Sequence, residues 1–451
     1  MKRNQYDLIV VGAGIAGLAI GEIFARSGFK VALIEKNERI CTEASGIHHE
    51  WFHFGSLYSI FPTNQFLRTM VGSIDDILLY YRDFDGMNLR VDAQGKLITI
   101  NKNGKWFRED SIDYIVNTIN DPDFTPSNND SVQDKVKKIF FKWTWDKNIK
   151  QFIARHNRYQ KYDWRRGCAS HYIPKAGLLD YSRNSVHKAE VPDARLDTNT
   201  HIEVKSYDRP MNAYGIISDL TRSYISYGGH IFTNSSFNHY VQGPKRSKIY
   251  LNNDTELEAK FLILALGQNL ERFAKGKIGV KAVASPLLVA YPHVCDVNFV
   301  RLTPFINKTI NHLTHEINGR RYSLIGGGYF AKADSDKEKE NARNALINRA
   351  RKVFPKLADA KVFESYFGYK VEVSTSYSKR NYLYHIERID DRVFIVVPGK
   401  FSLAFSLAVN TFHRLIGHYP NAYVVYDNNI DVTEWLCLMK HKNIVSDLVA
   451  D

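Results

Sequence analysis

Three glycines near the N-terminus, Gly12, Gly14 and Gly17, have the spacing of a dinucleotide-binding turn. Gly12 allows a sharp turn out of the apolar run at 8–11, and Gly14 leaves no side chain between the backbone and a pyrophosphate. Gly17 lets the following helix pack closely on that run, and the N-terminus of this helix attracts phosphate charge. The segment therefore predicts a bound dinucleotide.

An acidic residue completes this motif. Glu35 directly follows a second apolar run, residues 31–34, where dinucleotide-binding units place the carboxylate that accepts hydrogen bonds from an adenosine ribose. A strand, a helix, a second strand and this acid follow one another in the order that a βαβ unit requires. The prediction therefore rests on more than the glycines alone.

Length and composition favour a soluble enzyme. The chain has 451 residues, which predicts two or three domains. Its apolar stretches are shorter than the roughly 18 residues that span a bilayer, and the first strand begins too early for a signal peptide. The four cysteines (Cys41, Cys168, Cys295 and Cys437) are scattered, without a CxxC pair. We therefore expect a cytoplasmic protein without a membrane span.

Positive charge is concentrated in one segment. The net charge is +13, and residues 135–166 hold eleven lysines and arginines interleaved with aromatic residues. One interpretation is an amphipathic helix with its aromatic residues in the core and its lysines in water. The alternatives are contact with an anionic small substrate, or with nucleic acid through phosphate pairing and base stacking.

Glycine and proline residues divide the rest of the chain into further elements. Helices are expected within 209–229, over about 335–354 and over about 400–416. Strands are expected at 230–232, 248–251, 256–257, 261–266, 322–325 and 392–397.

The order of these elements resembles the flavoenzymes of the D-amino-acid oxidase superfamily, including its glycerol-3-phosphate and L-2-hydroxyglutarate dehydrogenase branches. The resemblance runs from residue 6 to about residue 417 and does not depend on the glycines alone. The other landmarks are ASGIHHEWFHFGSLY at 44–58 with an HxGxxY pattern at His53, Gly55 and Tyr58, FLILALG at 261–267, RRYSLIGGGYF at 320–330, FGYK at 367–370 and FIVVPGKFSLAFSLA at 394–408.

This resemblance implies an α/β fold: a Rossmann-type FAD-binding domain built from discontinuous segments, plus an inserted α+β substrate domain with a mixed sheet. We expect the FAD-binding domain in residues 1–85, 205–285 and 385–420, and the substrate domain in 86–204 and 286–384. Residues 421–451 are expected to form a strand-loop-helix appendage. The GGGYFA segment at 326–331 formally matches a second dinucleotide motif, but the charged residues after it favour a glycine turn at a strand end.

The resemblance also implies noncovalent FAD. The turn at 397–400 opens a predicted helix, so free N–H groups and the Lys400 ammonium would stabilise negative charge on the reduced flavin. Here the sequence PGKFS departs from the glycine-rich loop with a histidine that the family usually has. The expected cofactor contacts are Gly12, Gly14, Ile15, Ala16, Gly17, Glu35, Lys36, Ser45, Gly46, Phe237, Ala265, Gly267, Gly399, Lys400, Phe401 and Ser402.

Three residues are expected on the substrate side. His53 is a base or an orienting donor, although a structural histidine is an equal alternative. Lys370 would hold a carboxylate or phosphate where the family has arginine, and Tyr58 would donate a hydrogen bond. His48, His49 and His53 lack regular spacing and Glu50 is an isolated carboxylate in the sequence, so no metal is predicted.

Together these features predict an FAD-dependent oxidase or dehydrogenase. It would oxidise a C–H bond next to an amine or hydroxyl by hydride transfer to flavin N5, on an anionic substrate. One alternative is a flavoenzyme that modifies a nucleotide or a nucleic-acid-linked group and docks the polyanion through residues 135–166. Another is a non-catalytic flavin-binding interaction protein. The sequence predicts no oligomeric state.

Overall fold

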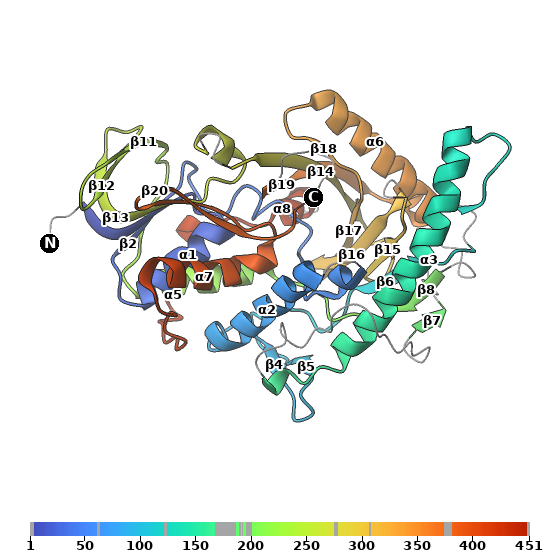
Figure 1. Ribbon diagram of the computed structural model, residues 1–451, viewed down its shortest axis with the longest axis horizontal. Helices are drawn as coiled ribbons and strands as arrows, with labels where there is room; N and C mark the ends of the chain where they lie inside the picture. The colour runs from blue at the N-terminus through green and yellow to red at the C-terminus, as the bar shows by residue number, and fades with distance from the viewer. Residues whose placement is uncertain are drawn as a thin grey trace.

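Two large sheets, each covered by helices, form this computed structural model (Figure 1). Both contain parallel and antiparallel pairs, which confirms the predicted α/β class with a mixed sheet. The structure describes residues 4–60, 64–120, 124–166, 186–188, 191, 193–194, 201–274, 278–305, 308–373 and 381–448, except for the side chains of 60, 64, 158, 159, 166, 186–188, 362 and 448. Cys168 lies outside the described residues.

The first sheet has eight strands and lies on the left of Figure 1. Its order is β10 (His230–Phe232), β2 (Val31–Ile34), β1 (Gln5–Val11), β13 (Glu256–Leu264), β12 (Ser247–Leu251) and β11 (Phe237–Gln242), with β21 (Val393–Val397) paired to β13 and β20 (His385–Asp390) paired to β21.

The central strands of this sheet are buried on both faces. In β1, Leu8 and Val10 belong to one apolar cluster, while Ile9 and Val11 belong to another. Successive side chains of a strand point to opposite faces, so a strand covered on both sides reads as a continuous apolar run. Helices α1 (Ile15–Arg26), α5 (Ala213–Ser226) and α7 (Ala404–Ile416) pack together beside this sheet (Figure 1).

Two predicted element boundaries in this half of the molecule are wrong. The strands expected at 256–257 and 261–266 are one continuous strand, β13, which runs antiparallel to β12 in its first part and lies parallel to β1. Lys260 interrupts its apolar pattern because the ammonium pairs with Asp7 at 2.7 Å rather than marking a turn. The helix expected from residue 400 begins at Ala404, after a 3₁₀ turn at Phe401–Leu403.

The second sheet has nine strands and lies on the right of Figure 1. Gly326 and Gly327 end one of its strands, so the GGGYFA segment follows a strand as predicted. The order is β18 (Ala331–Lys332), β14 (Val280–Tyr291), β17 (Arg320–Gly327), β16 (Ile310–Ile317), β15 (Phe299–Leu302), β6 (Asp113–Asn117), β8 (His201–Val204) and β7 (Val186–Lys188), with β19 (Val362–Val373) paired to β14.

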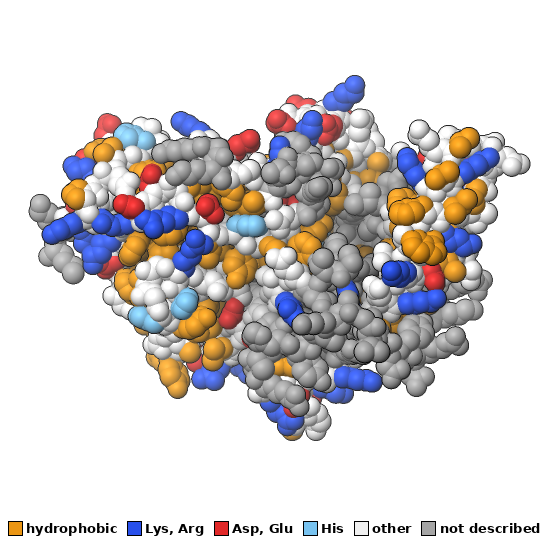
Figure 2. All heavy atoms as spheres, viewed as in Figure 1, with side chains coloured by type: hydrophobic (Ala, Val, Ile, Leu, Met, Phe, Trp, Pro, Cys, Tyr) orange, Lys and Arg blue, Asp and Glu red, His pale blue; other side chains and the backbone are white. Residues whose placement is uncertain are grey.

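Helices α6 (Asp336–Val353) and α3 (Val132–Gln160) pack on this second half of the molecule, and α3 has two different parts. Toward its C-terminus Trp145, Ile149, Phe152 and Ile153 are buried, which agrees with the amphipathic interpretation. Toward its N-terminus apolar side chains are exposed, and Figure 2 shows them among lysines at the upper right. The exposed residues are Val132, Val136, Ile139, Phe140 and Trp143.

Shorter elements connect these parts. They are α2 (Asn64–Tyr80), the strand pair β3 (Trp51–Phe52) and β9 (Arg209–Pro210), and the strand pair β4 (Leu89–Val91) and β5 (Leu97–Thr99). In the described part of the chain, none of the helices combines the length and apolar character needed to cross a membrane.

The C-terminal segment is docked on the core. Described residues 421–448 contain no strand, contrary to prediction: in the apolar run the N–H of Val425 donates to Tyr227 Oη at 3.0 Å, and further along the backbone bonds the loop that follows β2. The N–H of Ile40 donates to Trp435 O at 2.9 Å, and the N–H of Lys440 donates to Gly46 O at 2.9 Å. Helix α8 (Lys440–Leu448) then packs on β14, β16 and β19.

Two buried histidines join neighbouring elements of the second half. The His156 ring on α3 hydrogen-bonds Lys205 O through Nε2 at 2.6 Å. The His312 ring on β16 bonds Val297 O through Nδ1 at 2.8 Å and Ser323 Oγ through Nε2 at 2.7 Å. Burial lowers the pKa of each imidazole to about 4, so both are neutral in the folded protein at neutral pH.

We predict that these histidines reduce stability in mild acid. Their ordinary pKa near 6.5 in the unfolded chain means that the unfolded state binds more protons between pH 6.5 and 4. The free energy of unfolding should therefore fall as pH falls through this window, by up to about 3 kcal/mol per histidine. Urea unfolding at pH 7 and pH 5 measures the loss. His312→Gln should show a smaller loss than the unsubstituted protein, and an equal loss would contradict the prediction.

Candidate active site

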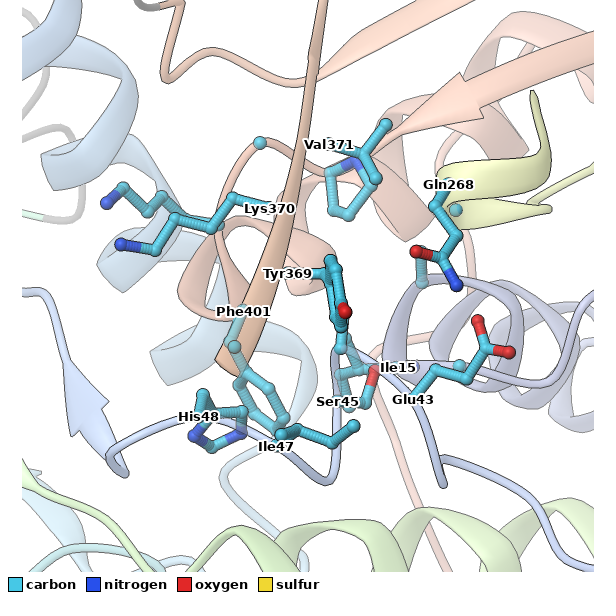
Figure 3. A pocket seen from close by; sticks show the side chains of 18 of the residues that line it. Ile15, Glu43, Ser45, Ile47, His48, Gln268, Tyr369, Lys370, Val371 and Phe401 are labelled. Atoms are coloured by element: carbon cyan, nitrogen blue, oxygen red, sulfur yellow. Dashed lines mark hydrogen bonds between the residues drawn. The ribbon is translucent and has the colours of Figure 1, made fainter. Parts of the chain in front are cut away.

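A cavity of about 770 Å³ runs between the two halves of the molecule. This volume lies within the range of roughly 300–1,000 Å³ that is usual for small-molecule sites. The glycine turn after β1 lines one part of the cavity and strand β19 lines another. Figure 3 shows Ile15, Ser45 and Glu43 on one side, with Tyr369 and Lys370 of β19 among the other lining side chains.

The glycine turn closes against the end of β13. Gly12 has φ of +97°, and a Cβ at this position would overlap the carbonyl oxygen of Ala265. A Cβ at Gly17 would overlap the carbonyl oxygen of Gly12. The first glycine is therefore required both by its backbone conformation and by the close approach of β13, and Gly17 is required by helix packing.

Two polar side chains fix this turn. Glu35 accepts the N–H of Ala13 through Oε2 at 3.1 Å and the N–H of Asn37 through Oε1 at 3.0 Å. Ser45 accepts the N–H of Ile15 through Oγ at 2.9 Å. Burial raises the pKa of Glu35, although these backbone N–H groups oppose the rise. The carboxylate thus holds the turn and also lines the cavity.

The turn fits a dinucleotide. A Cβ at Gly14 would reach to 3.2 Å from Ser45 Oγ and would fill the space over the N-terminus of α1. The first turn of α1 contains no acidic residue, so nothing on it opposes a pyrophosphate. These residues therefore match a dinucleotide, whose pyrophosphate needs uncovered backbone N–H groups and whose ribose needs a carboxylate nearby.

Most of the predicted cofactor residues are brought together here. Gly17, Gly46 and Ser402 do not line the cavity: Gly17 packs under the turn, a Cβ at Gly46 would lie 2.5 Å from Cys41 O, and Ser402 O accepts from Ser73 Oγ at 2.7 Å. The predicted residues that do line it are Gly12, Gly14, Ile15, Ala16, Glu35, Lys36, Ser45, Phe237, Ala265, Gly267, Gly399, Lys400 and Phe401.

The turn after β21 carries Lys400 into the cavity wall. Gly399 has φ of +66°, and a Cβ there would lie 2.6 Å from the carbonyl oxygens of Tyr382 and Leu383. The Lys400 Nζ lies 4.6 Å from the centre of the Tyr382 ring. Lys400 precedes the 3₁₀ turn and not α7 itself, which corrects the predicted helix start while keeping the ammonium at the cavity.

His53 lines the cavity and is 6% exposed. Its Nδ1 lies 3.4 Å from Asp208 Oδ2, and its ring packs on Trp51 at a centroid distance of 4.2 Å. Burial and the positive charge of Lys400 lower the pKa of His53 to about 4, although Asp208 acts in the opposite direction. The imidazole is therefore neutral at neutral pH.

Asp208, which was not predicted from the sequence, joins His53, Trp51 and Tyr114. It is fully buried, and its Oδ2 accepts from Tyr114 Oη at 2.6 Å and from Trp51 Nε1 at 3.0 Å. Its Oδ1 accepts the N–H of Phe54 at 2.9 Å. Burial alone would raise the pKa of Asp208, but His53, Tyr114 and the Phe54 N–H together lower it. The carboxylate is therefore ionised and faces the neutral His53.

Of the other two predicted substrate-side residues, Lys370 lines the cavity and Tyr58 does not. Lys370 lines the cavity from β19, with its Nζ 5.1 Å from the centre of the Phe330 ring (Figure 3). Tyr58 is buried behind His53, with the two rings 5.7 Å apart and edge to face, and does not line the cavity. The structure thus brings two of the three predicted catalytic residues to the cavity.

Glu50 is not isolated, contrary to the expectation from sequence. His315 and His441, far away in the sequence, lie beside its carboxylate together with Lys442. Glu50 itself does not line the cavity. No sequence spacing could have indicated this cluster, because its members come from three distant segments.

Comparison with known proteins finds a family match in the N-terminal segment. Residues 7–111 match the family described as FAD dependent oxidoreductase. The tRNA 5-methylaminomethyl-2-thiouridine biosynthesis bifunctional protein of Burkholderia mallei is 53% identical over 52 residues, which are 12% of this chain and 8% of that relative. The aligned segment is therefore a small part of either protein.

Solved structures show a similar fold over nearly the whole chain. L-alpha-glycerophosphate oxidase of Mycoplasma pneumoniae, with FAD bound, superposes with a TM-score of 0.59 at 14% identity, covering 94% of this chain and 97% of that one. Glycine oxidase of Geobacillus kaustophilus gives a TM-score of 0.55 at 12% identity, covering 97% and 99%. The match over residues 7–111 agrees with the predicted class of FAD-dependent oxidoreductase and its FAD cofactor, and the solved structures confirm the predicted fold over nearly the whole chain.

We predict that Gly12→Ala prevents FAD retention. The substitution combines a strained backbone, at about 1–2 kcal/mol, with an overlap against the Ala265 carbonyl oxygen. Purified protein should lose most of its flavin absorbance, and its melting temperature should fall. The matched control is Gly28→Ala, because Gly28 has φ of +88° but a Cβ there meets open space. Equal flavin content in the two variants would contradict the assigned role of the close approach.

Proposed function

We propose that this protein acts as an FAD-dependent oxidoreductase and oxidises a C–H bond next to an amine or hydroxyl of an anionic small molecule. FAD, when bound, accepts the hydride at N5. The noncovalent state of FAD, the cytoplasmic location and the division into domains predicted from the sequence belong to the same proposal.

The distribution of charge along the cavity carries this proposal. The acidic lining residues are Glu35 and Glu43, both near the glycine turn. The opposite part is lined by Lys370 and Lys400, whose charges both lower the pKa of His53. The positive potential of these two ammonium groups favours a substrate that carries a carboxylate or phosphate.

His53 is suited to act as the base. A neutral imidazole can accept the proton of a substrate amine or hydroxyl while the hydride leaves the adjacent carbon. Asp208 lies beside Nδ1, which leaves Nε2 as the nitrogen for the substrate. Trp51 stacks on the ring and also donates to Asp208, so the base and its orienting carboxylate are held by one packed unit.

A substrate linked to nucleic acid is a second candidate. Exposed Phe140 and Trp143 stand among lysines on the N-terminal part of α3, an arrangement that suits base stacking and phosphate contact (Figure 2). The short likeness to a tRNA-modifying protein points in the same direction. Oligonucleotide binding that weakens steeply with added salt, and that Trp143→Ala impairs, would favour this candidate.

Anaerobic reduction of the flavin is the experiment that tests the main proposal. The purified yellow protein is mixed with amino acids, hydroxy acids, phosphorylated polyols, nucleotides or oligonucleotides, and the visible spectrum is followed. Bleaching by one class of anionic small molecule supports the proposal. Bleaching only by neutral compounds, or by none of the panel, contradicts it, and the second result favours a non-catalytic flavin-binding protein.

We predict that Lys370→Met weakens substrate binding. Loss of the ammonium should raise KM for an anionic substrate about 10–100-fold, which corresponds to removal of one charge-assisted contact. Lys370→Arg should retain most of the affinity because the positive charge remains. Lys337→Met, on the exposed surface of α6, is the matched control and should leave KM unchanged. A KM that responds equally to all three substitutions would contradict the role of Lys370.

We predict opposite shifts of the pH profile for two neighbours of His53. The log of kcat/KM should fall below about pH 4, where His53 becomes protonated. Asp208→Asn removes an influence that raises the pKa of His53, so this limb should move to lower pH. Lys400→Met removes a positive charge that lowers the pKa of His53, so this limb should move to higher pH.

His53→Gln should reduce kcat/KM by about 10²–10⁴-fold, the range for loss of a general base. Asp219→Asn is the matched control for Asp208→Asn. Asp219 is also buried and accepts from Trp106 Nε1 at 2.7 Å, but it lies outside the cavity lining. Asp219→Asn should lower stability without moving the pH profile. A shift of the profile equal to that of Asp208→Asn would contradict the role assigned to Asp208.

A further inference from the structure

Three buried side chains from distant segments meet behind the wall of the cavity. Glu50 belongs to the loop after β2, His315 to strand β16 and His441 to helix α8. They are 1%, 5% and 0% exposed, respectively. One ligand-type atom from each lies within 4.8 Å of the others. None of the three lines the cavity, so the cluster is separate from the proposed flavin and substrate site.

The spacing within this cluster is too long for good hydrogen bonds. Glu50 Oε2 lies 3.4 Å from His315 Nδ1 and 3.3 Å from His441 Nε2, whereas N–H···O bonds are commonly about 2.9–3.0 Å. Within the described part of the chain, His441 Nε2 is buried and makes no hydrogen bond. The carboxylate oxygen therefore attracts both rings without bonding well to either.

The same spacing matches two ligands on one metal ion. Zinc binds imidazole nitrogen and carboxylate oxygen at about 2.0–2.2 Å. At tetrahedral angles, two such ligand atoms lie about 3.3–3.5 Å apart. The two separations from Glu50 Oε2 fall in or beside this interval, and the two imidazole nitrogens, within 4.8 Å of one another, would close toward it when an ion binds.

The surrounding groups orient the ligands. Tyr322 Oη lies 2.7 Å from His441 Nδ1, which directs the other ring nitrogen toward Glu50. Glu50 Oε1 accepts the N–H of Ala213 at 2.9 Å and faces Lys442 Nζ at 3.3 Å. One carboxylate oxygen is thus engaged by the protein, while Oε2 faces the two imidazoles.

The protonation states suit coordination. Burial lowers the pKa of both His315 and His441, so the rings are neutral at neutral pH. Burial alone would raise the pKa of Glu50, but Lys442, His441 and His315 together hold it well below its usual range. Two neutral imidazoles and one carboxylate form a ligand set used by zinc and related divalent metals.

We propose that Glu50 Oε2, His315 and His441 bind a zinc-class divalent metal ion, with water completing the coordination. The ion joins helix α8 to the loop after β2 and to strand β16. Its role is to fasten the C-terminal segment on the core. Lys442 opposes the ion by its charge, so affinity is lower than the ligand set alone would give.

Metal titration of the full-length holoprotein tests this proposal. The protein is stripped with chelator, dialysed and titrated with Zn²⁺ against a competing indicator dye, and bound metal is measured by elemental analysis. One equivalent should bind, and the melting temperature should rise with Zn²⁺ concentration. His315→Gln and His441→Gln should each weaken binding by at least about tenfold and abolish the thermal shift.

Two further variants separate metal binding from damage to the fold. Lys442→Met removes the opposing charge and should bind Zn²⁺ more tightly than the unsubstituted protein, a gain that misfolding cannot produce. His413→Gln, outside the cluster on α7, should bind as the unsubstituted protein does. Less than about a tenth of an equivalent bound, or the same affinity after His315→Gln and His441→Gln, would overturn the proposal in favour of an ion pair among Glu50, Lys442 and the two imidazoles.

Discussion

The close approach of backbone at Gly12 is the constraint on which the rest of the structure depends. Its N–H donates to Ile34 O at 2.8 Å, and Ala265 N–H donates to Val11 O at 2.8 Å, so strands β1, β2 and β13 end at the same place. No side chain fits between them. This shared edge positions Glu35, the start of α1 and the end of β13 around one opening, as parallel sheets with nucleotide sites do.

Both halves of the molecule supply positive charge to the other end of the cavity. Strand β19 pairs along the whole of β14 and carries Lys370 to the cavity, while the turn after β21 carries Lys400 from the first sheet. The cavity could therefore accommodate anionic groups of both the cofactor and the proposed substrate, because backbone N–H groups face one end and ammonium groups face the other. Neutral His53 lines the cavity, where it can accept a proton, and buried Asp208 lies beside its ring.

The motif residues were predictable because their roles are local. Gly12 and Gly14 form the turn after β1, and Glu35 at the end of β2 accepts the N–H of Ala13 in that turn, so their spacing within one βαβ unit indicates it. Asp208 and the partners of Glu50 were not predictable, because each meets its neighbours only through long-range packing, and a single aspartate or histidine carries no periodic signal. The errors at β13 and Lys400 have separate causes: Lys260 resembles a turn residue but pairs with Asp7 inside a continuous strand, and a 3₁₀ turn precedes α7.

The docking of the C-terminal segment has a consequence for synthesis of the chain. The loop that carries Ser45, His48 and His53 precedes its partners by a long stretch of chain: Lys440 N–H donates to Gly46 O, and Trp435 O accepts from Ile40 N–H. Domains generally fold as units during translation, from the N-terminus onward. Here the loop cannot complete its backbone bonds until a segment much later in the chain has been made, so this part of the cavity wall forms late in folding.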